Sequence, residues 1–320
     1  MPRNVVAIGK SAGALLDGIA GVIDVESAFV AIPDGYRLPH TVAETHIGGH
    51  PHMTPASFAA GRALLDYVDA HEDILFVVSG GGSACVEVPL APYTEEETAL
   101  ANAELIASGR PIGAINAERR RLSAIKGGKL AQRVRGRAVT LVYSDVSTGS
   151  IEDVASGPTL PGSKAILIAD NTTLVRAAAR IIGDARGVVL EEQIECDVED
   201  AARLLTARAR ELRGGQILVA GGEPTVVVRG SGRGGRCSEL AVRFALLSPC
   251  EALFGSSDGV DGNSGAAGIH LPCRRTPGGP AGWEAALRTS NSFEIATQIG
   301  EPIMIAPTGN NLRDLFLVAR

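Results

Sequence analysis

Residues Gly221–Leu240 read GGEPTVVVRGSGRGGRCSEL and set the expectation for the whole chain. The β-branched run Thr225–Val228 predicts a strand, and the amphipathic segment Ser238–Leu247 predicts a helix. The loop between them is rich in glycine and carries three arginines, Arg229, Arg233 and Arg236. Backbone N–H groups at a helix start can meet an anion, and guanidinium groups are planar donors suited to phosphate or carboxylate. The stretch therefore predicts a strand, a loop and a helix that together bind an anion.

The rest of the chain alternates buried apolar runs with helical patterns, which indicates a parallel sheet with helices on both faces. The strand-like runs are Asn4–Ile8, Ser27–Ile32, Ile74–Val78, Ala138–Tyr143, Ile166–Ala169, Val188–Leu190, Ile217–Ala220 and Ala252–Gly255. A chain of 320 residues is long enough for about two domains. We therefore expect two α/β domains. Residues 1–213 form a doubly wound, largely parallel, Rossmann-type domain, and residues 214–320 form a smaller C-terminal domain.

The composition argues against several classes of partner. A net charge of −6 is unlike the basic surface that nucleic acid requires. No apolar run approaches the roughly 18 residues of a membrane span, and the N-terminal MPRNVVAIGK lacks the pattern of a signal peptide. Five scattered cysteines without a CxxC pair suit a reducing compartment. We expect a cytoplasmic protein with neither a nucleic-acid nor a membrane partner.

Three predicted strands end in residues that suit ligand binding. Lys10 follows the first strand, Gly80–Ser83 follow the strand at 74–78, and Asp145 follows the strand at 138–143. Ligands of open parallel sheets bind at the carboxyl ends of the strands. The glycines allow close backbone approach, and Asp145 suits Mg²⁺ or a hydroxyl group. A solvated lysine, a plain turn and a structural aspartate are the alternatives, and the pattern alone leaves them open.

Two other polar segments give weaker signals. Ser257–Asn263 mixes Asp, Gly and Asn as calcium loops do, but it lacks their spacing and their distant glutamate. His40–His52 holds four histidines in a segment with glycine and proline, and metal ligands need a converging geometry that this pattern does not specify. We expect this segment to be a loop that is exposed or touches substrate.

The glycines of the opening stretch also spell GxGxxG, at Gly230, Gly232 and Gly235. Between a strand and a helix, this pattern is the fingerprint of a nicotinamide dinucleotide site. It supports an alternative, an NAD(P)H-dependent hydroxypyruvate reductase. A non-catalytic ligand-binding paralogue is a third hypothesis. The match is easily met by chance in so glycine-rich a loop, and its three arginines favour an exposed acid or phosphate.

Longer motifs follow one another in a recognisable order. They are Gly9-Lys10, SGGGSA at 79–84, LSAIKGGK at 122–129, SDV at 144–146, ASGPT at 155–159, GGEPTVVVRGSGRGGR at 221–236, SSDGVDG at 256–262 and PTGNNLRDL at 307–315. This series resembles glycerate 2-kinases that combine an N-terminal DUF4147 domain with a C-terminal MOFRL domain. The chain looks like a shortened member, because it begins almost at its first strand and is short between Thr159 and Asn171.

The resemblance implies an enzyme that transfers the γ-phosphoryl group of ATP to the 2-hydroxyl of D-glycerate with Mg²⁺. It implies Lys10 and Arg236 as catalytic residues, since both stabilise charge on the phosphoryl group. The predicted nucleotide-binding residues are Gly80, Gly81, Gly82, Ser83, Gly232, Gly234 and Gly235. The predicted substrate-binding residues are Arg229, Arg233, Glu223 and Asn310, and the candidate Mg²⁺ ligands are Asp145, Asp258 and Asp261. The expected partners are a small hydroxy acid and a nucleotide, and a homodimer is a further expectation.

Overall fold

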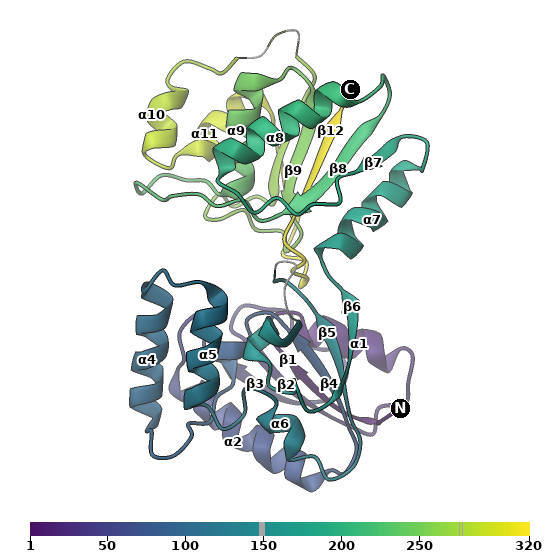
Figure 1. The fold of residues 1–320 in the computed structure, drawn as a ribbon, viewed down its shortest axis with the longest axis vertical. Helices are drawn as coiled ribbons and strands as arrows, with labels where there is room; N and C mark the ends of the chain where they lie inside the picture. The colour runs from purple at the N-terminus through teal and green to yellow at the C-terminus, as the bar shows by residue number, and fades with distance from the viewer. Residues whose placement is uncertain (147–150, 275, 277) are drawn as a thin grey trace. The chain divides into compact units, whose positions relative to one another are not determined.

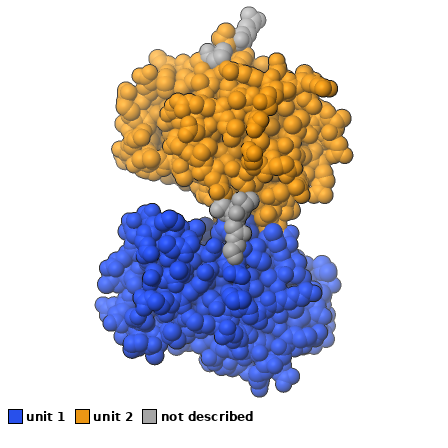
Figure 2. Space-filling view, viewed as in Figure 1, with its two compact units in different colours: residues 1–168 blue, residues 169–320 orange. Residues whose placement is uncertain are grey.

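The computed structural model describes residues 1–146, 151–274, 276 and 278–320. The chain divides into two compact units, Met1–Ile168 and Ala169–Arg320, which Figure 2 colours separately. The domain boundary expected at 213/214 does not coincide with this division. The reason is that β7 (Gly187–Val189) pairs with β8 (Ile217–Gly222), so the segment before residue 213 belongs to the second sheet.

The N-terminal unit is built on a six-stranded sheet in the order β3-β2-β1-β4-β5-β6 (Figure 1). The pairs β2–β3, β1–β2, β1–β4 and β4–β5 are parallel. The strands are β1 (Asn4–Ile8), β2 (Ser27–Pro33), β3 (Glu44–Gly48), β4 (Ile74–Ser79), β5 (Ala138–Tyr143) and β6 (Lys164–Ala169). The helices are α1 (Ala12–Ala20), α2 (Pro55–Ala70), α3 (Gly82–Cys85), α4 (Glu95–Ala107), α5 (Ile112–Leu122) and α6 (Lys129–Gln132), with a 3-10 segment η1 (Ile151–Ser156).

Alternation along the strands gives this sheet two buried faces. In β1, Val6 and Ile8 pack in the cluster that contains α2, whereas Val5 and Ala7 pack with α1. Successive side chains of a strand point to opposite faces, so continuous apolar strands require helices on both sides. The expected doubly wound α/β arrangement is confirmed for this unit.

The C-terminal unit has a second six-stranded sheet, in the order β11-β10-β9-β12-β8-β7. Only the β7–β8 pair is parallel, and the other pairs are antiparallel. The remaining elements are α7 (Asn171–Ile182), α8 (Val198–Glu211), α9 (Arg236–Leu247), β9 (Glu251–Ser256), β10 (Gly268–Leu271), α10 (Trp283–Arg288), α11 (Ser292–Ile299), β11 (Glu301–Ile303) and β12 (Asp314–Ala319). Phe316 and Val318 of β12 face α8 and α9, and Leu315 and Leu317 face α7. This unit is therefore also α/β, with a mixed sheet.

Two local expectations are wrong. Thr225–Val228 is not a strand: Thr225 forms one isolated bridge with Asp197, and Val227 and Val228 are largely exposed. The β-branched run has no neighbouring strand to complete a ladder, and β propensity depends on such a surface. The histidine segment His40–His52, expected as a loop, contains the edge strand β3.

Among the helices of the described residues, none has the length and apolar character needed to cross a membrane.

The N-terminal unit buries a complete ion pair. The side chains of Lys126 and Glu87 are each 1% exposed, and Lys126 Nζ donates to Glu87 Oε2. Ser123 Oγ donates to the other oxygen of Glu87 at 2.5 Å. Burial lowers the pKa of Lys126, and the charge of Glu87 acts against that effect. The lysine of the 122–129 motif therefore has a structural partner.

We predict that Glu87→Gln destabilises the N-terminal unit by roughly 3–5 kcal/mol, because it leaves the Lys126 charge buried without its partner. The double change Glu87→Leu/Lys126→Met recovers most of this loss, because it removes both buried charges. Urea unfolding measures the effect. All four tyrosines lie in the N-terminal unit and the single tryptophan lies in the other, so their emission reports the two units separately. An unchanged tyrosine transition in Glu87→Gln would contradict the prediction.

Candidate functional site

The carboxyl ends of β1, β4 and β5 bring together the predicted residues of the N-terminal unit. The Lys10 N–H donates to the Gly80 carbonyl at 2.8 Å. A Cβ on Gly80 would lie 1.6 Å from Asp145 Oδ2, and a Cβ on Gly81 would lie 2.8 Å from Lys10 Cγ. Gly81 also has φ +79°, a conformation that glycine adopts without strain. Close approach of Lys10 and Asp145 to this loop is therefore possible only because the loop is glycine.

A pocket of about 200 Å³ lies at this loop and is lined by Gly80, Gly81, Ser83 and Asp145. Its other polar lining residues are His50, Asn116, Arg119, Asp153 and Ser156. The Ser83 and Ser156 hydroxyls lie 2.5 Å apart, and Ser156 Oγ donates to Asn116 Oδ1 at 2.8 Å. A short chain of hydroxyl and amide groups thus holds Ser83 in place.

His50 reports the electrostatic character of this pocket. Burial, followed by the positive charges of Lys10, Arg119 and His52, lowers the pKa of His50 to about 4. The imidazole is therefore neutral at pH 7. Burial is the larger cause, and the three positive charges add to it, so His50 lies in a buried place close to cationic groups.

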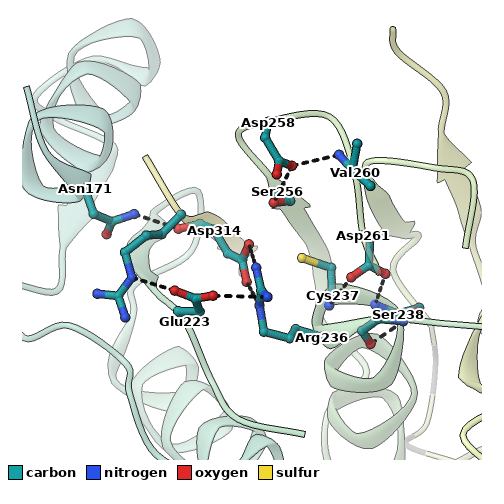
Figure 3. A network of polar contacts seen from close by, with 12 residues as sticks. Asn171, Glu223, Arg236, Cys237, Ser238, Ser256, Asp258, Val260, Asp261 and Asp314 are labelled. Carbon is teal, nitrogen blue, oxygen red and sulfur yellow. Dashed lines mark hydrogen bonds and ion pairs between the residues drawn. The ribbon is translucent and has the colours of Figure 1, made fainter. Parts of the chain in front are cut away.

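The C-terminal unit is organised around Asp314 and Arg236 (Figure 3). Arg236 is the first residue of α9, and its Nε and Nη2 donate to the two carboxylate oxygens of Asp314 at 2.9 and 3.1 Å. Asp314 is fully buried, whereas the Arg236 side chain is 35% exposed. Burial raises the pKa of Asp314, and the two hydrogen bonds from Arg236 offset part of that rise. Burial opposes the charge of Arg236, but the contacts with Asp314 outweigh it and raise the guanidinium pKa.

Glu223 extends this pair into a chain of alternating charges. Its Oε1 lies 3.1 Å from Arg236 Nη1, and its Oε2 accepts a hydrogen bond from Arg313 Nε at 3.1 Å. Arg313 Nη1 also donates to Glu195 at 2.8 Å. The predicted residues Glu223 and Arg236 are therefore in contact. Arg313, Asp314 and Glu195 complete their network, and sequence reasoning assigned none of them a role.

Asp261 occupies the start of α9. Its two oxygens accept hydrogen bonds from the Cys237 and Ser238 N–H groups, each at 2.9 Å. A Cβ on Gly235 would lie 2.1 Å from Asp261 Oδ1, so this glycine is needed for the cap. The N–H groups expected to receive an external anion are thus already bound to a carboxylate of the chain. Asp258 has a similar local role, because its Oδ1 accepts from Ser256 Oγ at 3.0 Å and from the Val260 N–H at 2.8 Å.

A pocket of about 710 Å³ in this unit is lined by Glu223, Arg236 and Arg313 together with Gly232, Gly234 and Gly235. The predicted Arg229, Arg233 and Asn310 are not among its lining residues. Arg233 donates to the Ser264 carbonyl, and its guanidinium carbon lies 5.0 Å from the centroid of the Phe293 ring. The Asn310 N–H donates to Thr308 Oγ1 at 3.1 Å. Arg229 lines a different pocket, together with α8, α9 and α10.

Backbone strain marks the same two pockets. Among the described residues, four non-glycine residues have positive φ: Ala155, Ser156, Ser290 and Arg313. Ala155 and Ser156 line the pocket of about 200 Å³, and Ser290 and Arg313 line that of about 710 Å³. Such conformations cost free energy and persist where the surrounding contacts enforce them, often at functional sites. Ala155, Ser156 and Arg313 belong to the ASGPT and PTGNNLRDL motifs, so the strain and the motifs indicate the same two places.

The described part of the chain holds no group of three or more His, Cys, Asp or Glu side chains arranged to bind a metal ion. The three candidate aspartates are divided between the two units, with Asp145 in the first and Asp258 and Asp261 in the second.

The residues missed by sequence reasoning belong to segments with little local pattern. Asn116 and Arg119 lie on α5, where a basic run indicates a solvated face. His50 lies among several histidines that the pattern cannot rank. Arg313 and Asp314 stand within PTGNNLRDL at 307–315, so the motif itself was the available signal.

Each of the two α/β units has a polar pocket beside a glycine-rich loop, an arrangement that suits ligand binding. A model of the DUF4147 family, described as a domain of unknown function, matches residues 3–182, and the chain belongs to this family. The MOFRL family model matches residues 216–314. Both matches agree with the order of motifs along the chain.

Relatives of known name align along nearly the whole chain. A Pyrococcus horikoshii protein named glycerate 2-kinase is 27% identical, over 98% of this chain and 86% of that protein. A Thermotoga maritima protein named D-glycerate 2-kinase is 28% identical, over 98% of this chain and 89% of that protein. A crystal structure of glycerate kinase from Thermotoga maritima matches with a TM-score of 0.89 and 25% identity, covering 100% of this chain and 92% of the other.

We predict that Arg236→Met destabilises the C-terminal unit by roughly 3–5 kcal/mol at pH 8, because Asp314 is left buried without its cation. The loss is smaller at pH 5. Burial holds the folded-state pKa of Asp314 above its unfolded value of about 3.9, so the folded state binds the extra proton and stability falls as pH rises. Urea unfolding followed by Trp283 emission measures both values.

The double variant Arg236→Met/Asp314→Asn is the control, because it removes the titrating carboxyl. Its free energy of unfolding should not show the difference between pH 5 and pH 8 that Arg236→Met causes. An equal loss at pH 5 and pH 8 in Arg236→Met alone would show that Asp314 is not the group responsible.

Proposed function

We propose that this chain is an ATP-dependent glycerate 2-kinase, which transfers the γ-phosphoryl group of ATP to the 2-hydroxyl of D-glycerate. The observation that carries the proposal is the close packing of Lys10 and Asp145 against one glycine loop, in a chain whose relatives are named glycerate 2-kinase. Phosphoryl transfer depends on positioning and on neutralising charge more than on covalent chemistry. A lysine, a carboxylate and a glycine loop at one strand edge suit that task.

In the proposed mechanism, the pocket of the N-terminal unit binds phosphate groups of the nucleotide. The loop of Gly80, Gly81, Gly82 and Ser83 supplies backbone and hydroxyl donors. Lys10 supplies positive charge to the phosphoryl group that is transferred. The charges of Lys10 and Arg119, which act after burial to lower the pKa of His50, place two cations near this pocket.

The C-terminal pocket is assigned to charge recognition by Arg236. Asp314 holds one edge of the guanidinium through two hydrogen bonds, so the group enters the reaction already oriented. The other edge contacts Glu223, which lines the pocket and is 40% exposed. An anion that binds Arg236 competes with this carboxylate. We assign Glu223 to substrate binding and Arg313, beside it, to the same pocket.

The other residues predicted to bind substrate, Arg233, Arg229 and Asn310, are assigned different roles. The side chain of Arg233 is engaged with Ser264 and Phe293, which suits a role in shaping the loop. Arg229 and Asn310 lie outside the lining of the 710 Å³ pocket, and we keep neither as a carboxylate clamp. The backbone of Gly232, Gly234 and Gly235 lines this pocket and stays a candidate for contacts with the ligand.

Mg²⁺ fits one of the three candidate carboxylates better than the others. Asp261 and Asp258 accept hydrogen bonds from backbone N–H groups of their own unit, whereas Asp145 lines the phosphate pocket beside Gly80. Proteins commonly hold Mg²⁺ by one or two carboxylates together with substrate phosphates, so a single aspartate is a suitable donor set. Asp145 would hold the ion, which would neutralise phosphate charge when bound.

The reductase alternative depends on a strand directly before the glycine pattern, and the structure has none there. A dinucleotide fingerprint requires its glycines to follow directly after a strand. Here β8 ends at Gly222, and the residues before Gly230 are not a strand. Location in the cytoplasm and assembly as a homodimer remain parts of the proposal that rest on the sequence and on the resemblance.

We predict that the protein forms ADP from ATP with D-glycerate, and that Lys10→Ala lowers kcat roughly a hundredfold or more. The reason is that removing Lys10 takes charge stabilisation from the transferred phosphoryl group. A coupled ADP assay over a panel of hydroxy acids measures the activity. Lys164→Ala removes an exposed lysine of β6 in the same unit and is the matched control.

The same preparation is tested with NADH and hydroxypyruvate. Consumption of NADH without ADP formation from any hydroxy acid would favour the reductase. Tight binding of glycerate or ATP without turnover would mark the non-catalytic alternative. Unchanged turnover in Lys10→Ala would refute the role given to this residue.

A further inference from the structure

The C-terminal unit has a second pocket, of about 490 Å³, that the proposed reaction does not use. It lies among α8, α9 and α10, and it shares no lining residue with the 710 Å³ pocket. Its apolar wall includes Leu246, Leu287 and Trp283, the single tryptophan of the chain. Trp283 is partly buried and packs against the hydrophobic core of the unit. The pocket therefore offers an aromatic surface on a rigid support.

Arginines dominate the polar part of this pocket. Four line it, Arg203, Arg229, Arg243 and Arg288, against two glutamates, Glu199 and Glu284. Arg203 and Arg243 both pair with Glu199, and each has a second carboxylate partner nearby. The other two guanidiniums are less engaged.

Arg288 and Arg229 retain donors for a ligand. Arg288 lies 4.0 Å from Glu284, and both side chains are largely exposed. Within the described residues, the guanidinium of Arg229 has no hydrogen bond or ion pair, although its backbone N–H donates to Ser290 Oγ at 2.9 Å. Guanidiniums bind phosphate through paired N–H groups and stack on flat rings. An aromatic wall with two available guanidiniums suits a ligand that has both a ring and a phosphate.

The segment after α10 connects this pocket to the larger one. Ser290, two residues after α10, lines the 710 Å³ pocket, and α10 itself carries Trp283 and Arg288. The glycine loop packs against the same turn. A Cβ on Gly230 would lie 2.6 Å from the Thr289 carbonyl oxygen, and a Cβ on Gly232 would lie 2.6 Å from Asn291. A displacement of α10 or of Arg229 must therefore move the loop that lines the larger pocket, because such tight packing leaves little slack.

We propose that the pocket formed by α8, α9 and α10 is an effector site for an aromatic organic phosphate of the nucleotide class, coupled through the 289–291 turn to the 710 Å³ pocket. The anionic group binds Arg229 and Arg288, and the ring lies against Trp283. Binding at this site does not depend on the proposed kinase function. Only the coupling to glycerate rests on it.

Emission of the single tryptophan gives a local binding assay. We predict that AMP changes Trp283 emission saturably, whereas adenosine and inorganic phosphate at equal concentrations do not, because each lacks half of the recognised chemistry. Arg288→Gln should weaken AMP binding about tenfold by removing one charge-assisted contact. Arg210→Gln, which removes an exposed arginine of α8 that does not line the pocket, should leave the titration unchanged.

Equal AMP titrations for Arg288→Gln and the unchanged chain would overturn the site, as would the absence of any AMP effect. An equal response to adenosine would overturn recognition of the phosphate, and an equal response to inorganic phosphate would overturn recognition of the ring.

In the coupling experiment, AMP shifts the KM for D-glycerate in the unchanged chain but not in Arg288→Gln. A KM that is the same with and without AMP would overturn the coupling alone, and a lack of any kinase activity would count against the proposed function and leave the emission result standing.

Discussion

The bidentate contact between Asp314 and Arg236 is the constraint on which the C-terminal site depends. A fully buried carboxylate is costly without a cation and hydrogen bonds, so the start of β12 and the start of α9 must remain together. Glu223, at the end of β8, then joins Arg236 to Arg313. Asn171 adds a further tie, because its amide donates to the carbonyls of Leu312 and Asp314. Carboxylates from β8 and β12 thus meet on the guanidinium of Arg236, and Asn171 of α7 ties the backbone beside Asp314 (Figure 3).

The N-terminal unit reaches a comparable result by a different route. Its strand ends approach so closely that side chains at Gly80 and Gly81 would collide with Asp145 and Lys10. One unit therefore positions its charges by removing side chains from a loop, and the other by pairing charges across a core. Both contain non-glycine residues in left-handed conformations at their pockets. Free energy stored in strained backbone is a cost that the surrounding packing must offset, which is why rigid sheets underlie both sites.

Local patterns predicted much of the fold, because a helix or strand that buries one face has apolar residues at a regular spacing in its sequence. Thr54 and Pro55 begin α2 with a pattern typical of helix starts, and Thr94 and Glu97 cap α4 with reciprocal hydrogen bonds of 3.1 and 2.8 Å. The run Thr225–Val228 misled because strand formation needs a neighbour that local sequence does not specify.

The site was predicted in part for the same reason. Lys10, Gly80, Gly81 and Asp145 were found because parallel strand ends meet at one edge. The partners of Arg236 were missed because Asp314 is distant in sequence and a buried carboxylate leaves no periodic signal. Asp261 was assigned to a metal when its structural contacts are with the helix start. Whether a polar side chain faces a ligand or the chain itself is decided by tertiary packing.

We propose that this chain phosphorylates D-glycerate at its 2-hydroxyl. Proton–phosphorus NMR of the product formed from ATP and D-glycerate identifies the carbon that carries the phosphate, through the coupling between phosphorus and the carbon-bound protons. We expect a phosphorus signal coupled to the single proton on carbon 2. Coupling to the two protons on carbon 3, or the absence of any phosphorylated acid, would contradict it.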